Sequence, residues 1–112
     1  MNKMRDSILD VMKKRRSIRK YKKENVSKDL LLQLIEAAIW APSGSNVQPW
    51  YFIIVDNANT IEQVNAFSPG LLGGPPSIIL LCSDRKKAFE KAGTLGRDEL
   101  CVMDISMAAQ NI

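Results

Sequence analysis

Two short segments of the chain carry side chains that could bind a phosphorylated ligand. The first is "RRSIRKY", which follows one helix-like segment and precedes another. As extended chain it would place Arg15, Ser17 and Arg19 on one side, each about 6.6 Å from the next. Two guanidinium groups flanking a hydroxyl suit a phosphate, although basic residues that end a helix and enter a solvated turn give the same pattern.

The second segment is "APSGSNVQPW", which supplies short, neutral donors and acceptors. Ser43, Ser45 and Asn46 offer hydroxyl and amide groups, and Gly44 permits a positive φ and a close approach of the backbone. We expect Gln48 to be extended because it precedes a proline. The loop suits an uncharged ring or polyol, or it is simply a well-formed connection.

Together the two segments match the two ends of a mononucleotide such as FMN, one suiting the phosphate and the other the uncharged body. Positive charge is local: residues 1–28 hold 11 Lys and Arg against 3 Asp and Glu, whereas residues 29–112 hold 5 against 9. We expect no nucleic acid, because Tyr21 is the single aromatic residue near this charge and no helix carries basic residues along its face. A non-enzymatic module that docks on an anionic partner through residues 13–23 is the alternative.

The residues available for catalysis are limited, because the chain has no histidine. Neither a Ser-His-Asp arrangement nor a histidine metal site can form. Cys82 and Cys101 form no CxxC pair and are expected to be small buried residues rather than zinc ligands or a disulfide. We therefore expect no catalytic side chain and no metal, and a bound cofactor would supply the reactive atoms.

Hydrophobic periodicity places these segments between helices and strands. Asp6 or Ser7, Ser27 and Asn59 are expected to cap helices. A Gly/Pro-rich segment, residues 68–76, is expected to be irregular. The predicted helices cover residues 6–16, 28–41, 59–67, 85–93 and 98–112, and the predicted buried strands cover residues 50–55 and 77–83. Helices interleaved with buried strands indicate one layered α/β or α+β domain.

Composition is that of an ordinary globular protein, with 46% apolar and 25% charged residues. No apolar run is long enough for a membrane span, so no membrane partner is expected. The first residues are too charged for a secretory signal, and the default location is cytoplasmic. The last predicted helix is still apolar at Ile112, which leads us to expect that residues 1–112 are a single domain, incomplete at the C-terminus.

The joint occurrence of "RRSIRKY" and, about twenty residues later, "APSGSNVQPW" leading into "YFIIV" resembles the start of the nitroreductase family of FMN-dependent oxidoreductases. "GGPPSIILLCSD" and "DISMAAQNI" are similar to that family's second core strand and dimer helix. The resemblance implies an α+β fold, with helices around a mainly antiparallel central sheet, and an intertwined homodimer.

The resemblance also implies roles for individual residues. The phosphate and ribityl chain of FMN would be bound by Arg15, Arg16, Ser17 and Arg19. The flavin would be contacted, from the other subunit, by Pro42, Ser43, Gly44, Asn46 and Gln48. Family members pass two electrons from NAD(P)H through the flavin to a nitro group, quinone or similar small acceptor, and relatives carry out dehalogenation, flavin fragmentation or ring oxidation. If the chain ends at Ile112, we expect weak FMN binding and poor solubility.

Two further residues are left open. Asp104 interrupts an apolar run, so it either faces solvent or has a partner across a dimer interface, and we assign it no catalytic role. Asn65 is the candidate counterpart of an asparagine that contacts the flavin in the family.

Overall fold

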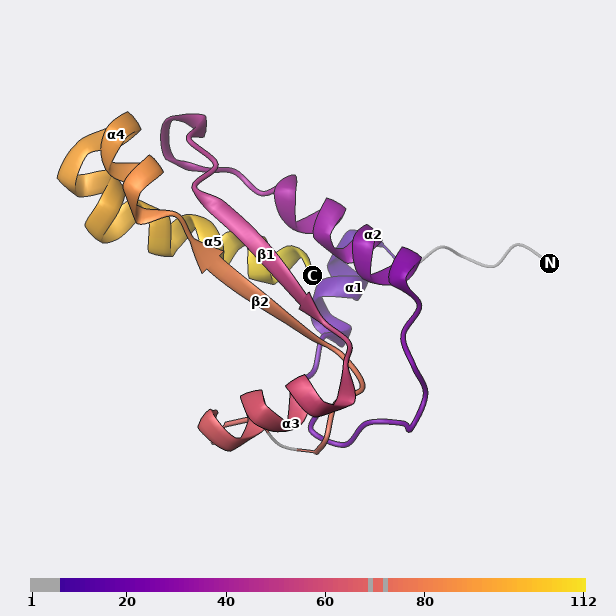
Figure 1. Cartoon of the computed structure of the whole chain (residues 1–112). Helices are drawn as coiled ribbons and strands as arrows, with labels where there is room; N and C mark the ends of the chain where they lie inside the picture. Colours follow the sequence, from indigo (N-terminus) through magenta and orange to yellow (C-terminus); the bar gives the residue numbers. More distant parts are fainter. Residues whose placement is uncertain (1–6, 69, 72) are drawn as a thin grey trace.

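In the computed structural model, which describes residues 7–68, 70–71 and 73–112, helices alternate with two β-strands (Figure 1). This mixture confirms the predicted α+β class. In chain order the elements are α1 (Ile8–Lys14), α2 (Lys28–Ile39), the short 3₁₀ helix η1 (Gly44–Asn46), β1 (Trp50–Val55), α3 (Ala58–Phe67), β2 (Ile78–Ser83), α4 (Arg85–Leu95), the π-helical turn η2 (Gly96–Leu100) and α5 (Cys101–Asn111).

The two strands form an antiparallel pair, in which Trp50 lies opposite Ser83 and Val55 opposite Ile78. The bounds of β1 are as predicted, and β2 begins one residue later than predicted. The expectation that both strands are buried is wrong. Burial alternates along β1, with Tyr51 and Ile53 exposed, and every residue of β2 is partly exposed. The helices that the structure describes cover one face of β1.

The core lies where α5 packs on α2 and on the covered face of the sheet. Ala38, Ala41 and Ala108 are buried at this contact, and Trp50 and Phe52 of β1 pack against them. Small side chains on both helices allow a close approach and leave room for the two aromatic rings. Trp50 thus closes the end of its loop against the core.

Side-chain caps fix the starts of the first two helices. The backbone N–H of Leu30 donates to the Ser27 hydroxyl at 3.3 Å, and Ser7 and Asp10 form a capping box at the start of α1. The predicted caps Ser7 and Ser27 are confirmed, whereas Asp6 lies outside the described residues.

Several predicted boundaries need correction. Helix α1 ends at Lys14 rather than at residue 16, α2 ends at Ile39 rather than at residue 41, and α5 begins at Cys101 rather than at residue 98. Asn57, not Asn59, caps α3, because the Asn57 side chain accepts the N–H groups of Asn59 and Thr60 at 3.0 and 3.2 Å. Gly93 was expected to end α4; its φ of 63° does interrupt the helical geometry, yet the helix resumes and continues to Leu95. The interruption follows from the ability of glycine to adopt a positive φ.

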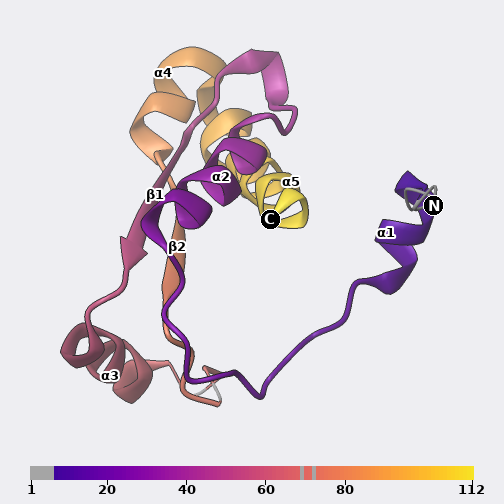
Figure 2. The same cartoon turned by 90° about the vertical axis from the view of Figure 1, so that its right-hand side faces the viewer.

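Helix α1 lies apart from the rest of the chain at the end of a long segment without regular structure (Figure 2). Its apolar residues Ile8, Leu9, Val11 and Met12 are between 57% and 77% exposed. The radius of gyration is 16.4 Å, whereas a compact domain of this length has about 13 Å. The apolar face of α1 is therefore present but not covered within one chain.

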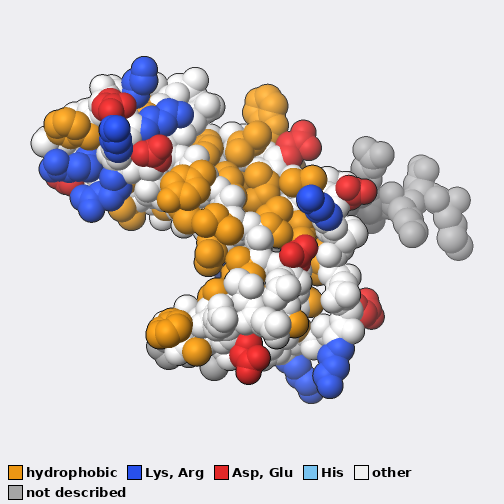
Figure 3. Space-filling view, in the orientation of Figure 1, with side chains coloured by type: hydrophobic (Ala, Val, Ile, Leu, Met, Phe, Trp, Pro, Cys, Tyr) orange, Lys and Arg blue, Asp and Glu red, His pale blue; other side chains and the backbone are white. Residues whose placement is uncertain are grey.

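Apolar side chains also gather across the middle of the molecule, between the charged region around α4 and the region around α3 (Figure 3). Residues 68, 70–71 and 73–76 have no helix or strand, as predicted for the Gly/Pro-rich segment, and residues 69 and 72 lie outside the described part. In the described ranges no helix is long and apolar enough to cross a membrane.

Candidate functional site

The arginine segment, residues 15–23, leaves the end of α1 without regular structure and is exposed throughout. The segment is neither helix nor strand, and the predicted alternation of its side chains between two sides stays a prediction. Arg15, Ser17 and Arg19 therefore lie on an accessible stretch of backbone, where they can meet a ligand from solvent.

Arg16 also has a structural role that the sequence did not indicate. Its Nη1 atom donates to the carbonyl oxygens of Lys13 and Arg15, both at 2.8 Å. The Lys13 carbonyl belongs to the last turn of α1, where no intrahelical donor is available, and Arg15 is the C-cap residue that follows the helix. Arg16 thus caps α1 as well as being a candidate phosphate ligand.

The polar loop, residues 42–48, is held by its own hydrogen bonds. The Ser43 carbonyl accepts the N–H of Asn46 at 3.0 Å, and the Ser43 hydroxyl accepts the N–H of Gln48, also at 3.0 Å. The Val47 N–H donates to the Gly44 carbonyl at 3.2 Å. Ser43 therefore organises the loop from within, and its side chain is already engaged with the backbone.

The backbone of the polar loop differs from the prediction at two residues. Gly44 was expected to supply a positive φ, but the positive values lie at Ser45 (54°), Asn46 (52°) and Gln48 (54°). The close approach of the backbone that was also predicted at Gly44 is observed, and its neighbour is Leu100. A Cβ on Gly44 would lie 2.9 Å from Leu100 Cδ1. Gln48 is not extended as expected, since its N–H turns toward Ser43. Non-glycine residues adopt such φ values only where their surroundings impose them.

Asp104 anchors the polar loop to α5. Its side chain is 2% exposed, and its Oδ1 atom accepts the N–H of Gly44 at 3.1 Å. The interpretation that Asp104 faces solvent is wrong, because the helix turns this residue toward the loop. The partner found for the carboxylate is in the same chain, and the contact joins residues far apart in sequence.

The start of α4 supports the other end of the loop. Asp84, which caps α4 through the N–H of Lys87 at 2.9 Å, donates its own N–H to the carbonyl of buried Pro49 at 2.7 Å. Lys87 Nζ reaches the Gln48 carbonyl at 3.4 Å. No sequence pattern marked these contacts, since they depend on how β2 returns beside β1.

Two ion pairs meet at Asp98 in the turn after α4, one with Arg97 and one with Arg85. Arg97 donates to both carboxylate oxygens of Asp98, at 2.7 and 2.8 Å, and its guanidinium lies 5.3 Å from the centre of the Phe89 ring. The hydrogen bond from Arg97 lowers the pKa of Asp98 to about 2, and Arg85 contributes in the same direction. Asp98 is therefore ionised at neutral pH.

The arginine segment and the polar loop lie at opposite ends of α5 within one chain. Arg15 and Arg16 line a groove between α1 and the last turns of α5, which include Gln110. Gly44 lies beside Leu100 and Asp104, where α5 begins. Figures 1 and 2 both show the two segments on different sides of the molecule. Within one chain, the arginine segment and the polar loop do not come together.

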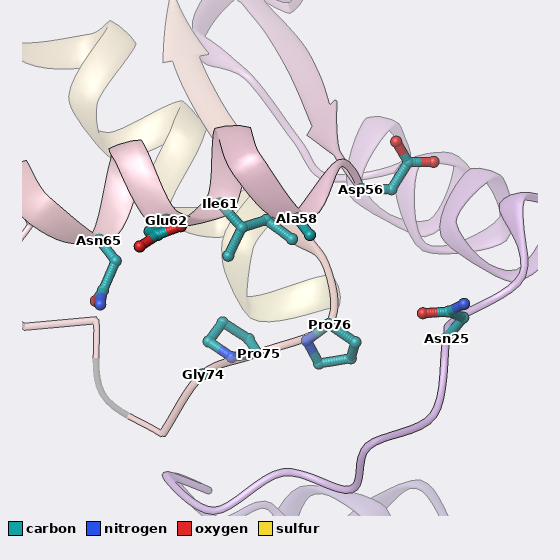
Figure 4. A pocket seen from close by; sticks show the side chains of 9 residues that line it. All are labelled: Asn25, Asp56, Ala58, Ile61, Glu62, Asn65, Gly74, Pro75 and Pro76. Atoms are coloured by element: carbon teal, nitrogen blue, oxygen red, sulfur yellow. The ribbon is translucent and has the colours of Figure 1, made fainter.

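A separate cavity of about 340 Å³ lies between α3 and the chain that precedes β2 (Figure 4). Ala58 and Ile61 face the paired prolines across it. Asn65, the candidate flavin-contacting asparagine, lies on α3 at the edge of this cavity. The lining residues are Asn25, Asp56, Ala58, Ile61, Glu62, Asn65, Gly74, Pro75 and Pro76. Among the described residues, no group of three side chains suited to a metal ion was found.

A sequence model of the Nitroreductase family matches residues 12–70, more than half of the chain. A provisionally named NADH dehydrogenase/NAD(P)H nitroreductase of Methanothermobacter thermautotrophicus is 34% identical over 107 residues, which are 94% of this chain and 52% of that protein. An iodotyrosine deiodinase of Thermotoga neapolitana is 39% identical over 57 residues, 51% of this chain and 31% of that protein.

Solved structures agree with the sequence comparison. An FMN-dependent nitroreductase from Clostridium difficile R20291 superposes with a TM-score of 0.72 and 30% identity, covering 93% of this chain and 57% of that one. A provisionally named NADH oxidase from Clostridium acetobutylicum gives a TM-score of 0.74 and 35% identity, covering 87% of this chain and 55% of that one. These relatives match most of this chain, whereas the chain spans about half of their length. With its arginine segment, its polar loop and its α+β fold, the chain belongs to the nitroreductase family.

Proposed function

We propose that the chain forms the flavin-binding part of an FMN-dependent NAD(P)H oxidoreductase that works as a homodimer. The observation that supports this most directly is the separation of the two polar segments at opposite ends of α5. Each segment is open to solvent, and the uncovered apolar face of α1 adjoins the arginine segment. A second copy that covers α1 can bring the arginine segment of one chain to the polar loop of the other.

The donors in the two segments fit the two ends of FMN. In our assignment Arg15, Ser17 and Arg19 bind the phosphate, with Arg16 contributing from the end of α1, because planar charged forks pair well with phosphate oxygens. These residues lie on exposed backbone without acidic neighbours in sequence.

The polar loop offers neutral groups for the uncharged part of the ligand. Asn46 and Gln48 are exposed, and Pro42 lies at the loop entrance. The Asp104 carboxylate accepts the Gly44 N–H, so this backbone donor is already used within the chain. The Ser43 hydroxyl accepts the Gln48 N–H and keeps its own O–H to donate. We assign direct polar contact to the Asn46 amide, which is exposed, and to the Ser43 O–H.

Bound FMN would accept a hydride from NAD(P)H and pass two electrons to a small acceptor such as a nitro compound or a quinone. The chain's own contribution is to bind and orient: the arginine segment fixes the phosphate and the polar loop limits the position of the ring. We assign no acid-base residue, and the chain contains no histidine.

A flavin titration of paired variants tests the phosphate assignment. Arg15→Ala with Arg19→Ala should weaken FMN binding at least about tenfold, because each charge-assisted hydrogen bond contributes about 1.5–3 kcal/mol. Lys20→Ala with Lys22→Ala removes the same charge from the other side of the extended segment and should have a smaller effect. Equal loss in both variants would indicate general attraction of anions, as in a non-enzymatic docking module, and unchanged binding would refute the assignment.

Dehalogenation is the second candidate activity, and the match to the iodotyrosine deiodinase favours it over flavin fragmentation and ring oxidation. The flavin-binding residues would be the same in both cases. Turnover of NAD(P)H with a nitroaromatic acceptor, compared with an iodinated phenol, distinguishes nitroreduction from dehalogenation. Dehalogenation is excluded if the iodinated phenol supports no NAD(P)H oxidation above the rate without acceptor.

A further inference from the structure

We propose that Gly73 is a positioning residue for the arginine segment: its lack of a side chain lets the backbone of Arg19 lie directly against it. This inference rests on the proposed function, since it assigns to Gly73 a part in phosphate binding. Gly73 precedes β2 and is far in sequence from the residues it would position.

The contact between Gly73 and Arg19 is very close. A Cβ built on Gly73 would lie 2.0 Å from the Arg19 carbonyl oxygen and 3.2 Å from Cδ2 of Tyr21. Separations under 3.0 Å essentially do not occur for real Cβ atoms. Because the atom at 2.0 Å is backbone, no side-chain rotation can relieve the clash. Any residue larger than glycine therefore displaces either the turn or the arginine segment.

Displacing the Arg19 backbone would affect one end of the ligand only. The guanidinium moves with its backbone, and charge-assisted hydrogen bonds to a phosphate depend on distance and angle. The polar loop is anchored separately, by Asp104 at the start of α5. A change at Gly73 should thus weaken recognition of the phosphate and leave recognition of the ring unaltered.

The neighbouring glycine provides a matched control. Gly73 has a φ of +85° and Gly74 a φ of +60°, so an alanine is strained at either position. No atom lies within 4 Å of the Cβ that Gly74→Ala would add. The difference between the two alanine variants isolates the contact with Arg19 from the backbone strain.

Titration with FMN and with riboflavin, which lacks the phosphate, tests the proposal through flavin fluorescence. Wild-type chain should prefer FMN over riboflavin at least about tenfold, as expected for a charge-assisted phosphate contact. Gly73→Ala should lose most of this preference while its riboflavin affinity stays the same, and Gly74→Ala should keep the preference. If Gly73→Ala keeps it too, or if both variants lose it equally, the proposal is overturned.

Hydrogen exchange without ligand supplies a second measurement. Amides of α2 and α5 should stay protected in both Gly73→Ala and Gly74→Ala, because the contact with Arg19 lies outside these helices. Loss of this protection in Gly73→Ala overturns the proposal, because it would make Gly73 a residue of general stability. If wild-type chain does not prefer FMN, the phosphate assignment itself fails, and that result is distinct from a failure at Gly73.

Discussion

Replacing Asp104 tests whether the buried carboxylate holds the polar loop in place. Asp104→Leu keeps a side chain of similar size but removes the acceptor for the Gly44 N–H, which now lies 3.1 Å from Oδ1. A hydrogen bond to a charged group contributes about 1.5–3 kcal/mol. Leucine also removes the desolvation cost of a carboxylate that is 2% exposed, which opposes the loss.

We expect the loss of the bond to dominate, because the unpaired Gly44 N–H stays beside α5 and cannot turn to solvent without moving the loop. The net decrease in the free energy of unfolding should be about 2 kcal/mol for Asp104→Leu. Asp104→Asn keeps an acceptor oxygen and should lose about 1 kcal/mol. For a domain of this size, the larger value corresponds to a decrease in Tm of roughly 8 °C or more.

Thermal unfolding followed by circular dichroism measures the order of stability. Ser106→Ala is the control on the same helix, because the exposed Ser106 hydroxyl bonds only within α5, to the Val102 carbonyl at 2.8 Å. Its effect should stay within about 0.5 kcal/mol. Hydrogen exchange of residues 43–48 should increase in the leucine variant alone. If Asp104→Leu proves as stable as wild type, or more so, carboxylate desolvation outweighs the bond and the anchoring argument is refuted.

Two further predictions follow from charge and exposure. Because Arg97 lowers the pKa of Asp98 from 3.8 to about 2, this pair stabilises the fold above pH 4 and is lost as the pH falls toward 2. Unfolding curves across that range should show a smaller decrease in Tm for Asp98→Asn than for wild type; equal slopes would mean that the pair contributes nothing. For the homodimer that we propose, Ile8→Asp with Val11→Asp should shift the sedimentation coefficient from dimer toward monomer, whereas Phe67→Asp, at a residue 88% exposed on α3, should not.

The elements could be predicted from the sequence where a short pattern decides the local structure. Ser27 begins α2 because its hydroxyl reaches a backbone N–H three residues later, and Pro42 lies just beyond the helix end. The run from Trp50 to Val55 was predicted with its observed bounds, since apolar and β-branched residues between turn formers favour a strand.

Details that depend on distant parts of the chain could not be predicted. The positive φ of Gln48 contradicts the preference of a residue before proline, because a hydroxyl of Ser43 draws its N–H inward. Asp104 allowed two interpretations, since periodicity alone cannot show that a loop far away in sequence supplies a partner. Gly73 appeared only as one glycine of an irregular segment, and its contact with Arg19 needs the fold to be seen.

The arginine segment and the polar loop are held in place by different contacts. Effects of substitutions on stability can therefore be separated from their effects on ligand geometry. Asp104 fixes the polar loop to α5, inside the core that includes Ala108. The arginine segment lies against Gly73 through the Arg19 backbone, and Arg15 and Arg16 line the groove beside the last turns of α5. Substitutions in the core should therefore disturb the ring end of the ligand together with stability. Substitutions at Gly73 should change phosphate recognition with little loss of stability. In the homodimer that we propose, the packing of two copies on one another would set the distance between the arginine segment of one chain and the polar loop of the other.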